Sequence, residues 1–430
     1  MIFVIFFVYK IFNKVWNIKL IELKQLDKVN ISNLIEDLTN KKDYKKHGVS
    51  ENSNYTKLIE KCSSSKEIKL ELAKYFNIKP DQIYFEDISN IEDLKKAVIC
   101  FGNVDVAYSK YTGNLDNLRI IFGDADFRYS EITSLKNLEK IGGSANFENS
   151  KITDIGNLKE IGGSANFRNS KITDLGNLKE IGGFAVFEYS ETTSLKNLEK
   201  IGKNAYFAYS KITDLGNLKE IGGNVDFEYS EITDLGNLKV IGRNASFENS
   251  EITSLKNLEK IGGDANFRNS KITDLGNLKE IGGSANFYNL ETTSLKNLEK
   301  IGKNAYFTGS KITDLGNLKE ISGDAYFKCS EITSLKNLEK IVGHAYFAYS
   351  KITDLGNLKE IGGYANFRYS EITSLKNLEK IGGNLYINRL DIKGLDKVEV
   401  KGRIHYKDKD YTLQEFRKLL KKYQNQQIFE

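Results

Sequence analysis

One pattern of apolar and polar residues, 20 residues long, recurs from about Phe101 to Val398. Its clearest copy, Ile141–Glu160, reads IGGSANFENSKITDIGNLKE, and the period holds without a slip from Ile121 to Ile381. A fixed period of this length is typical of a repeat solenoid, in which each copy forms one coil that stacks on its neighbours. We therefore expect a solenoid of about 15 coils over residues 101–398.

The apolar positions within one copy follow two spacings. Ala145 and Phe147 are two residues apart, which is the spacing of one face of a β-strand. Other apolar positions are three residues apart, as in a 3₁₀ or loosely helical stretch; they are Ile152, Ile155, Leu158 and Ile161. Each coil is therefore predicted to have a short strand on one side, a tight helical turn on the other, and the apolar side chains inside.

Two hydroxyl positions recur as regularly as the apolar ones. Serine returns every 20 residues from Ser130, with a break at Leu290, and threonine returns without a break from Thr133 to Thr373. Stacked hydroxyls can bond to the amides and carbonyls of turns. We expect these two columns to form a structural ladder.

Charged positions change sign from one coil to the next over much of the array. The predicted cross-coil pairs are Glu139 over Lys159, Lys140 over Glu160, Glu131 over Lys151, Glu199 over Lys219 and Glu259 over Lys279. Opposite charges on adjacent strands attract and like charges repel, so this alternation favours the correct register. Recent duplication of a two-copy gene segment would give the same pattern without selection, and both explanations stay open.

The most variable positions are those predicted to point outward near the strand, at 144, 146, 148 and 149 and their equivalents. They are rich in Tyr, Asn, Ser and Arg, which make rigid amphipathic contacts and adaptable hydrogen bonds in recognition surfaces. Neutral drift is the alternative, since tyrosine also suits strands, but exposed positions on the helical side vary less. The partner-binding candidates are Tyr129, Tyr189, Tyr206, Tyr209, Tyr229, Tyr306, Tyr326, Tyr346, Tyr349, Tyr369, Arg168 and Arg268.

The repeat has a family resemblance. The stretch NSKITDLGNLKEIGG at residues 169–183 resembles bacterial leucine-rich repeats of the internalin kind, and LKNLEKIGG resembles receptor L-domain-like repeats. The resemblance covers the repeat array and implies a parallel strand face, a short 3₁₀ or loop convex side, and non-catalytic recognition of a partner on the strand face. Serine replaces the usual ladder asparagine and alanine replaces a strand leucine, so a straighter β-solenoid is the alternative architecture.

Both ends of the array are predicted to be helical caps. Residues 17–100 lack the repeat and are expected to form a small helix-rich domain that covers the first coil, with helical spacing in Lys57–Phe76. Within residues 399–430, Thr412–Glu415 is a capping box that opens a helix at 412–424. Covered ends prevent open-edge pairing; contact of the basic C-terminal helix with acidic lipids is the alternative.

The apolar segment at residues 1–16 bears on where in the cell we expect the protein to be. Its uninterrupted run, Ile2–Tyr9, is shorter than the roughly 20 residues that span a bilayer, and no cleavage signal follows it. We favour a buried start of the first domain and a cytoplasmic location. An N-terminal anchor or export, with membrane contact through residues 1–14, is the alternative.

Composition excludes several function classes. Three Cys and three His stand far apart, and neither a P-loop, an HExxH motif, paired Cys nor a Ser/His/Asp grouping is found, so we expect no catalytic residue, metal or cofactor. The net charge is +5, and the segment Lys393–Gln427, with ten Lys/Arg and five Asp/Glu, carries all of it. A neutral repeat array argues against a nucleic-acid partner.

We therefore expect a bacterial, non-enzymatic binding protein that recognises a protein or glycan through the variable strand face. A structural spacer without a specific ligand is the first alternative. A weak enzymatic role of the N-terminal domain is the second. The oligomeric state stays open.

Overall fold

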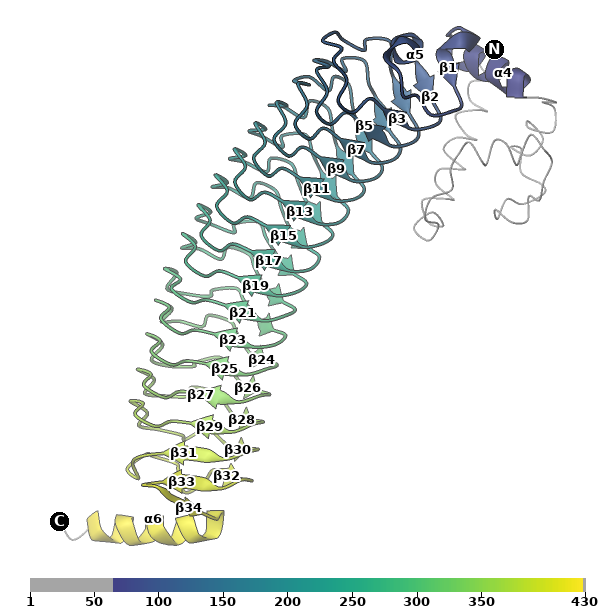
Figure 1. Cartoon of the computed structure of the whole chain (residues 1–430). Helices are drawn as coiled ribbons and strands as arrows, with labels where there is room; N and C mark the ends of the chain where they lie inside the picture. Colours follow the sequence, from purple (N-terminus) through teal and green to yellow (C-terminus); the bar gives the residue numbers. More distant parts are fainter. Residues whose placement is uncertain (1–64, 428–430) are drawn as a thin grey trace, which may run out of the picture. The chain divides into compact units, whose positions relative to one another are not determined.

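The repeats form a parallel β-solenoid of about 16 turns of 20 residues with few helices, which confirms the β-solenoid alternative. The structure is a computed structural model that describes residues 65–427. The described chain forms two compact units, one of residues 65–172 and 176–183 and the other of 173–175 and 184–427. Figure 1 shows the stacked coils within each unit. The predicted N-terminal segment 1–16 and much of the predicted cap lie outside the described residues.

The first unit begins with helices and continues as coils. Its helices are α4 (Ser65–Phe76), the 3₁₀ helix η2 (Pro80–Gln82) and α5 (Ile91–Lys96). One row of its strands contains β1 (Ile83–Tyr84), β2 (Ile99–Cys100), β4 (Ile120–Ile121), β6 (Lys140–Ile141), β8 (Glu160–Ile161) and β10 (Glu180–Ile181). The other row contains β3 (Val104–Asp105), β5 (Ala125–Asp126), β7 (Ala145–Asn146) and β9 (Ala165–Asn166).

The second unit repeats the same two rows and ends in a helix. Its even strands are β12 (Lys200–Ile201), β14 (Glu220–Ile221), β16 (Val240–Ile241), β18 (Lys260–Ile261), β20 (Glu280–Ile281), β22 (Lys300–Ile301), β24 (Glu320–Ile321), β26 (Lys340–Ile341), β28 (Glu360–Ile361), β30 (Lys380–Ile381) and β32 (Glu399–Val400). Its odd strands are β11 (Ala185–Val186), β13 (Ala205–Tyr206), β15 (Val225–Asp226), β17 (Ala245–Ser246), β19 (Ala265–Asn266), β21 (Ala285–Asn286), β23 (Ala305–Tyr306), β25 (Ala325–Tyr326), β27 (Ala345–Tyr346), β29 (Ala365–Asn366), β31 (Leu385–Ile387) and β33 (Ile404–Tyr406). The antiparallel strand β34 (Lys409–Tyr411) and helix α6 (Leu413–Gln427) follow.

Each coil contributes two strands of two residues, and each strand pairs in parallel with its equivalent one coil away. Ala145 pairs with Ala165, and Ile141 pairs with Ile161. Between the two strands the chain turns sharply at a pair of glycines. A Cβ added to Gly162 would lie 2.1 Å from the carbonyl oxygen of Gly142, so glycine allows a close approach in this coil, while Ser322 and Val342 occupy the equivalent position in others.

The predicted helical side of the coil is wrong. In the described coils the residues around Ile152 belong to no helix or strand, Ser134 forms an isolated parallel bridge with Asp154, and the next residues form a turn. The turn is closed by a hydrogen bond from the Leu158 N–H to the Ile155 carbonyl (3.3 Å). The first and fourth residues of a β-turn lie close together, so both of their side chains can face inward. These residues are three apart, which is also the spacing of one face of a 3₁₀ helix.

The core is a stack of identical side chains in register. The ring centroids of Phe147 and Phe167 are 5.3 Å apart at an interplanar angle of 12° in the first unit. In the second unit the same column continues from Phe187 to Phe367, with Phe327 and Phe347 4.9 Å apart. These rings are at most 1% exposed. A one-residue slip would turn every one of them outward, so the apolar column fixes the register.

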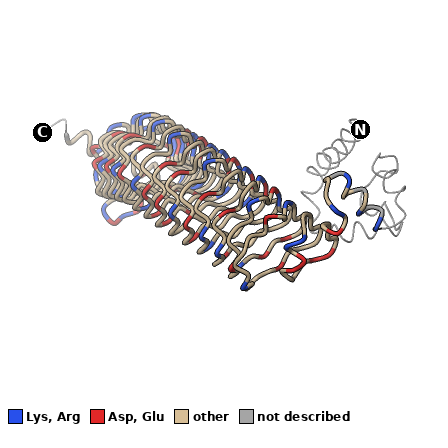
Figure 2. The backbone as a smooth tube through the Cα atoms, turned by 90° about the horizontal axis from the view of Figure 1, so that it is seen from above, with Lys and Arg blue, Asp and Glu red and all other residues tan. Residues whose placement is uncertain are grey.

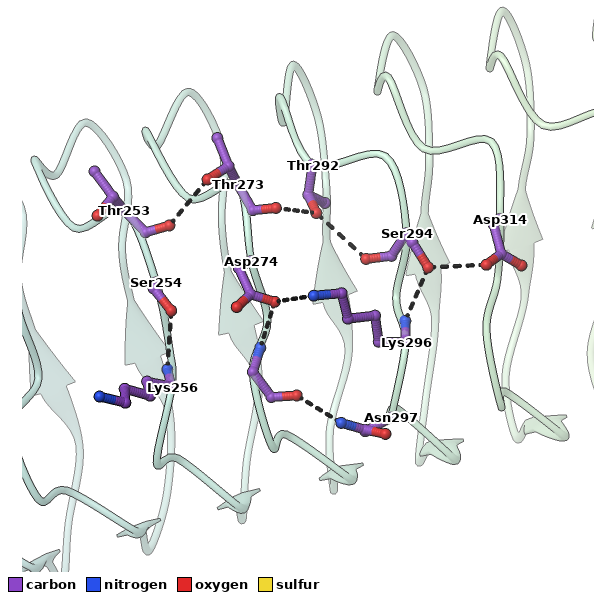
Figure 3. Close-up of polar contacts among 11 residues, drawn as sticks. Thr253, Ser254, Lys256, Thr273, Asp274, Thr292, Ser294, Lys296, Asn297 and Asp314 are labelled. Atoms are coloured by element: carbon purple, nitrogen blue, oxygen red, sulfur yellow. Dashed lines mark hydrogen bonds and ion pairs between the residues drawn. The ribbon is translucent and has the colours of Figure 1, made fainter.

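Hydroxyl and amide ladders connect successive coils. The Thr273 hydroxyl donates to the Thr253 carbonyl (3.4 Å), and the Asn297 amide donates to the Gly276 carbonyl (2.9 Å) (Figure 3). The asparagine ladder is not among the predictions. Thr292 stands in the apolar column, and its buried hydroxyl is satisfied by the Thr273 carbonyl at 2.9 Å.

The serine column differs from its predicted role. The Ser230 hydroxyl donates to the Phe227 carbonyl (2.8 Å), and Ser310 and Ser370 do the same within their own turns. Nine further serine hydroxyls in the described coils are buried without a hydrogen-bond partner. Serine therefore acts here chiefly as a small buried residue behind the phenylalanine column; the nine are Ser130, Ser150, Ser170, Ser190, Ser210, Ser250, Ser270, Ser330 and Ser350.

Charged residues of both signs lie side by side along the coils (Figure 2). Two predicted pairs form, Lys140 with Glu160 (3.0 Å) and Lys219 with Glu199 (2.8 Å). Glu139 instead binds Arg119 on the preceding coil, and Glu259 binds Lys239. Each glutamate has a cation on the coil before it and another on the coil after it. Exposed ion pairs contribute little free energy, so the glutamate pairs with one cation in some coils and with the other elsewhere.

Helices lie at both ends of the described chain. Ala73 of α4 belongs to an apolar cluster with Ile83, Val98, Ile99 and Phe101, and β1 pairs with β2, so the parallel sheet extends into the segment predicted as a cap. At the other end the Thr412 N–H donates to Glu415 (2.8 Å) and Phe416 of α6 is buried. Within residues 65–427 no helix combines the length and apolar character needed to cross a membrane.

Candidate functional site

The outward position at 144 and its equivalents has a structural role. The Ser144 N–H donates to Asp124 Oδ1 (2.7 Å), and the Asn244 N–H donates to Asn224 Oδ1 (3.1 Å). His344 occupies the same position, and its Nδ1 accepts the Tyr364 N–H (3.0 Å). The side chain at this position therefore caps the amide of the next coil. Asp, Asn, Ser and His all carry an atom that can accept this hydrogen bond, so the variation among them is explained without a ligand.

The outward position at 146 divides into two classes. Where it holds Asp or Asn, the side chain accepts the amide hydrogen two residues later, as Asn266 does from Arg268 (3.2 Å). This is a local turn that short polar side chains make readily. Tyrosine has no such acceptor, so the local turn does not explain Tyr206, Tyr306 or Tyr346. These positions are half-buried.

The outward position at 149 has a backbone conformation that disfavours most side chains. Its φ is positive in the coils that carry Asn249 (53°), Gly309 (67°) and Tyr229 (52°). Asparagine and glycine adopt this left-handed region readily, while other residues lose roughly 1–2 kcal/mol. Asparagine at this position follows from the backbone. Tyrosine does not, although it recurs at Tyr108, Tyr129, Tyr189, Tyr209, Tyr229, Tyr349 and Tyr369.

The tyrosines at 149-type positions stack into what we call the turn row. In the second unit the ring centroids of Tyr189, Tyr209 and Tyr229 are 5.1 and 5.2 Å apart. Tyr349 and Tyr369 form a further pair at 5.1 Å. The side chains of the first three are 49–50% exposed. In the first unit, Tyr108 and Tyr129 stack in the same way at 5.0 Å.

The tyrosines at 146-type positions form what we call the strand row, in the second unit. Tyr306, Tyr326 and Tyr346 stack at centroid distances of 4.8 and 4.4 Å. Tyr364 meets Tyr346 edge-on and stacks on His344 at 4.1 Å. Partial burial, followed by the neighbouring Tyr346, raises the pKa of the Tyr326 and Tyr364 hydroxyls. The Tyr326 hydroxyl donates to Asp324 Oδ2 (3.3 Å), so it is held within the row.

The strand row continues toward the C-terminus through residues that the sequence prediction omitted. Tyr386 stacks on His405 at 4.2 Å, and Arg368 lies 5.1 Å above the Tyr386 ring. Tyr288, also omitted, lies under Arg268 at 5.3 Å. Tyr364 could have been found from the sequence, because it stands at a position where most copies hold a small hydrogen-bond acceptor.

Stacking decides which parts of these rings face solvent. In a row with interplanar angles of 3° and 18°, as from Tyr189 to Tyr229, neighbouring rings cover each other's faces. The ring edges are not covered in this way, and the Tyr229 hydroxyl accepts a hydrogen bond from the Asn249 amide (3.3 Å). Each row therefore presents an apolar strip with a hydrogen-bonding group at each coil. Each inner ring of a row is held in place by the rings stacked on both of its faces.

Charged side chains flank the rows. Glu228 lies beside Tyr229, and burial, then Asp226 and Glu248, raise the pKa of its carboxyl. Arg268 Nε is 3.9 Å from Glu248 Oε1. Arg168, in the first unit, is exposed, and its N–H donates to Asn166 (3.0 Å). Of the twelve predicted residues, the second unit brings Tyr189, Tyr209 and Tyr229 into one row, Tyr306, Tyr326 and Tyr346 into another, and Tyr349 with Tyr369 into a pair.

Comparisons with known proteins give no relative: neither a family model nor a curated protein matches the chain. In residues 65–427, His, Cys, Asp and Glu side chains do not gather in groups of three or more that could hold a metal ion. Burial raises the pKa of the Cys100 thiol to about 12. The tyrosine rows are thus the feature of the described chain that most needs a functional explanation.

Proposed function

We propose that this chain is a non-enzymatic interaction protein whose tyrosine rows recognise a protein or glycan partner. The observation that carries the proposal is the turn row, where tyrosine occupies a left-handed backbone position that the same fold fills elsewhere with asparagine or glycine. Residues held in sparsely populated backbone conformations are concentrated at functional sites.

The exposed groups suit recognition. Tyrosine supplies a large, rigid contact area at low entropic cost together with a hydroxyl that hydrogen-bonds. In the rows each ring is further restrained by its neighbours, with centroids 5.1 Å apart between Tyr189 and Tyr209. A partner therefore meets side chains that are already ordered, which reduces the entropy lost on binding.

The test replaces the turn row by the residue that the fold itself uses at that position. We expect Tyr189→Asn, Tyr209→Asn and Tyr229→Asn together to leave the fold intact, because Asn249 and Asn269 adopt the same φ of 53°. The purified full chain and this variant are compared on a glycan array and by cross-linking capture in lysate of the source cells. Binding should be lost from the variant.

A matched control replaces Lys196, Lys256 and Lys376 by Asn, since these exposed lysines lie at the turn away from the tyrosine rows. This control should bind as the unchanged chain does. Identical partners for the unchanged chain and the tyrosine variant would contradict the proposal and favour the structural spacer. The leucine-rich relationship, the bacterial origin and the enzymatic alternative for residues 17–100 stay predictions.

A further inference from the structure

Successive coils of the second unit present equivalent groups at a constant step. Ring centroids are 5.1 and 5.2 Å apart in the turn row and 4.8 and 4.4 Å apart in the strand row. A partner that engages several coils has to repeat at a similar step. A single β-strand lying along the solenoid does not, because its same-face side chains are about 6.7 Å apart. A second stack of paired strands does, at about 4.8 Å.

Charge on the outward positions of the second unit is separated along the coils. In the coils from Phe184 to Asn269, acidic residues dominate: Glu188, Asp226, Glu228, Glu248 and Asp264, against Arg268 and, at the adjoining glycine position, Lys203 and Arg243. In the coils from Ser284 to Asp408, basic residues dominate: Lys328, Arg368, Arg389, Arg403 and Lys407, against Asp324 and Asp408. Two copies in parallel would place like charges together. Two copies in antiparallel orientation place opposite charges together.

The acidic half also contains a contact between like charges. Glu228 and Glu248 occupy equivalent positions on adjacent coils, where like charges repel. Burial, and then Asp226 and Glu248, raise the pKa of the Glu228 carboxyl, while Arg268 Nε lies 3.9 Å from Glu248 on its other side. A partner that supplies basic side chains would relieve this repulsion.

We infer that the partner of this face is a second copy of the chain, bound antiparallel so that the acidic half of each copy lies against the basic half of the other. This inference rests on the proposed role of the tyrosine rows as a recognition surface. The contact is two-fold symmetric, so each copy contributes both halves, as in most homodimers. The tyrosine rows supply its apolar contacts, and the charges set its orientation.

The available area suits a stable dimer. The coils from Tyr189 to His405 span about 11 steps of about 4.8 Å, which is about 53 Å. The outward positions from the strand to the turn are about 13 Å wide at about 3.3 Å per residue. Each copy thus offers roughly 700 Å², or about 1,400 Å² in total, within the range of specific interfaces.

Sedimentation velocity of the full chain tests the inference. The chain should be a dimer that weakens as salt rises, because screening reduces the attraction between the halves. Two charge-reversal variants are made: Glu228→Lys with Glu248→Lys, and Lys328→Glu with Arg368→Glu. Each alone should raise the dimer dissociation constant roughly 100-fold. Mixed in equal amounts, the two variants should form a heterodimer, because both contacts then join opposite charges.

The control reverses Glu199 and Glu259 to Lys, which directly precede strands β12 and β18 and lie away from the tyrosine rows, and it should leave the dimer unchanged. A chain that stays monomeric up to about 100 µM, or a dimer that either reversal leaves intact, would overturn the inference. Failure of the mixed variants to associate would overturn it as well. A third outcome separates the two proposals. If the chain is monomeric and binds a glycan or another protein, and the tyrosine-to-asparagine variant does not bind it, the self-pairing is refuted and the proposed function stands.

Discussion

Phe227 and Tyr229 are two residues apart on the chain and should differ sharply in their effect on stability. Phe227 is fully buried between Phe207 and Phe247, with centroids 5.4 and 5.3 Å away. Replacing a buried phenylalanine by alanine costs about 3–5 kcal/mol. Tyr229 is 49% exposed and stacks on Tyr209 at 5.2 Å, a contact worth about 0.5–1.5 kcal/mol.

Tyr229→Asn also removes a cost, because Tyr229 has a φ of 52° and asparagine tolerates that conformation. The gain of about 1 kcal/mol roughly cancels the lost stacking, so the variant should change stability by less than about 1 kcal/mol. The free energies of local opening of the two variants should thus differ by about 3 kcal/mol. This difference is more than a hundredfold in the equilibrium constant for local opening.

Hydrogen exchange measured by mass spectrometry is the suitable assay, because a repeat solenoid need not unfold in one step. Phe227→Ala should speed exchange in the coils around residues 221–240 by about a hundredfold, and Tyr229→Asn by less than about fivefold. Far-UV circular dichroism checks that both variants fold. Equal acceleration by the two variants would refute the division into an inner scaffold and an outer recognition row.

Three further predictions follow from single buried or charged groups. Cys329 is exposed and Cys100 is buried with a raised pKa, so peptide mass spectrometry after iodoacetamide treatment at pH 8 should find Cys329 modified and Cys100 modified only after unfolding. Ser150→Ala should leave the melting temperature unchanged or raise it, since its buried hydroxyl has no partner among the described residues, whereas Ser230→Ala should lower it through loss of the bond to Phe227. The raised pKa of Glu228 means that its charged form opposes folding, and this penalty is absent below the unfolded pKa and grows as pH rises through the folded pKa. Glu228→Gln should therefore melt at a higher temperature than the unchanged chain at pH 7, and the difference should shrink as pH falls to 4, as measured by calorimetry.

The sequence predicts the coil, its register and its inward columns, because these depend on spacing alone. The 20-residue period and the pair Ala145 and Phe147 indicate a stacked strand with one buried face. The second strand, such as Lys140–Ile141, was missed because two residues with one buried side chain show no alternation. The helical side was wrong because a β-turn and a 3₁₀ stretch give the same three-residue spacing.

The candidate site is predictable in part. Variation and tyrosine content locate the outward face, but they do not separate residues with structural roles from residues without them. The acceptor role of Asp124 and the local turn of Asn266 depend on backbone geometry between and within coils. The left-handed position does leave a signal, since Asn249 and Gly309 alternate there with tyrosine, and that combination indicates positive φ.

Hydroxyl-radical footprinting of the full chain over a concentration series distinguishes the inner phenylalanine column from the outer tyrosine rows, since phenylalanine and tyrosine both react when water reaches them. In dilute solution we expect fast oxidation of Tyr189, Tyr209 and Tyr229 and almost none of Phe207 and Phe227. At high concentration the tyrosines should become protected while the phenylalanines do not change. Tyrosines that resist oxidation even when dilute, or phenylalanines that react as fast, would contradict the account.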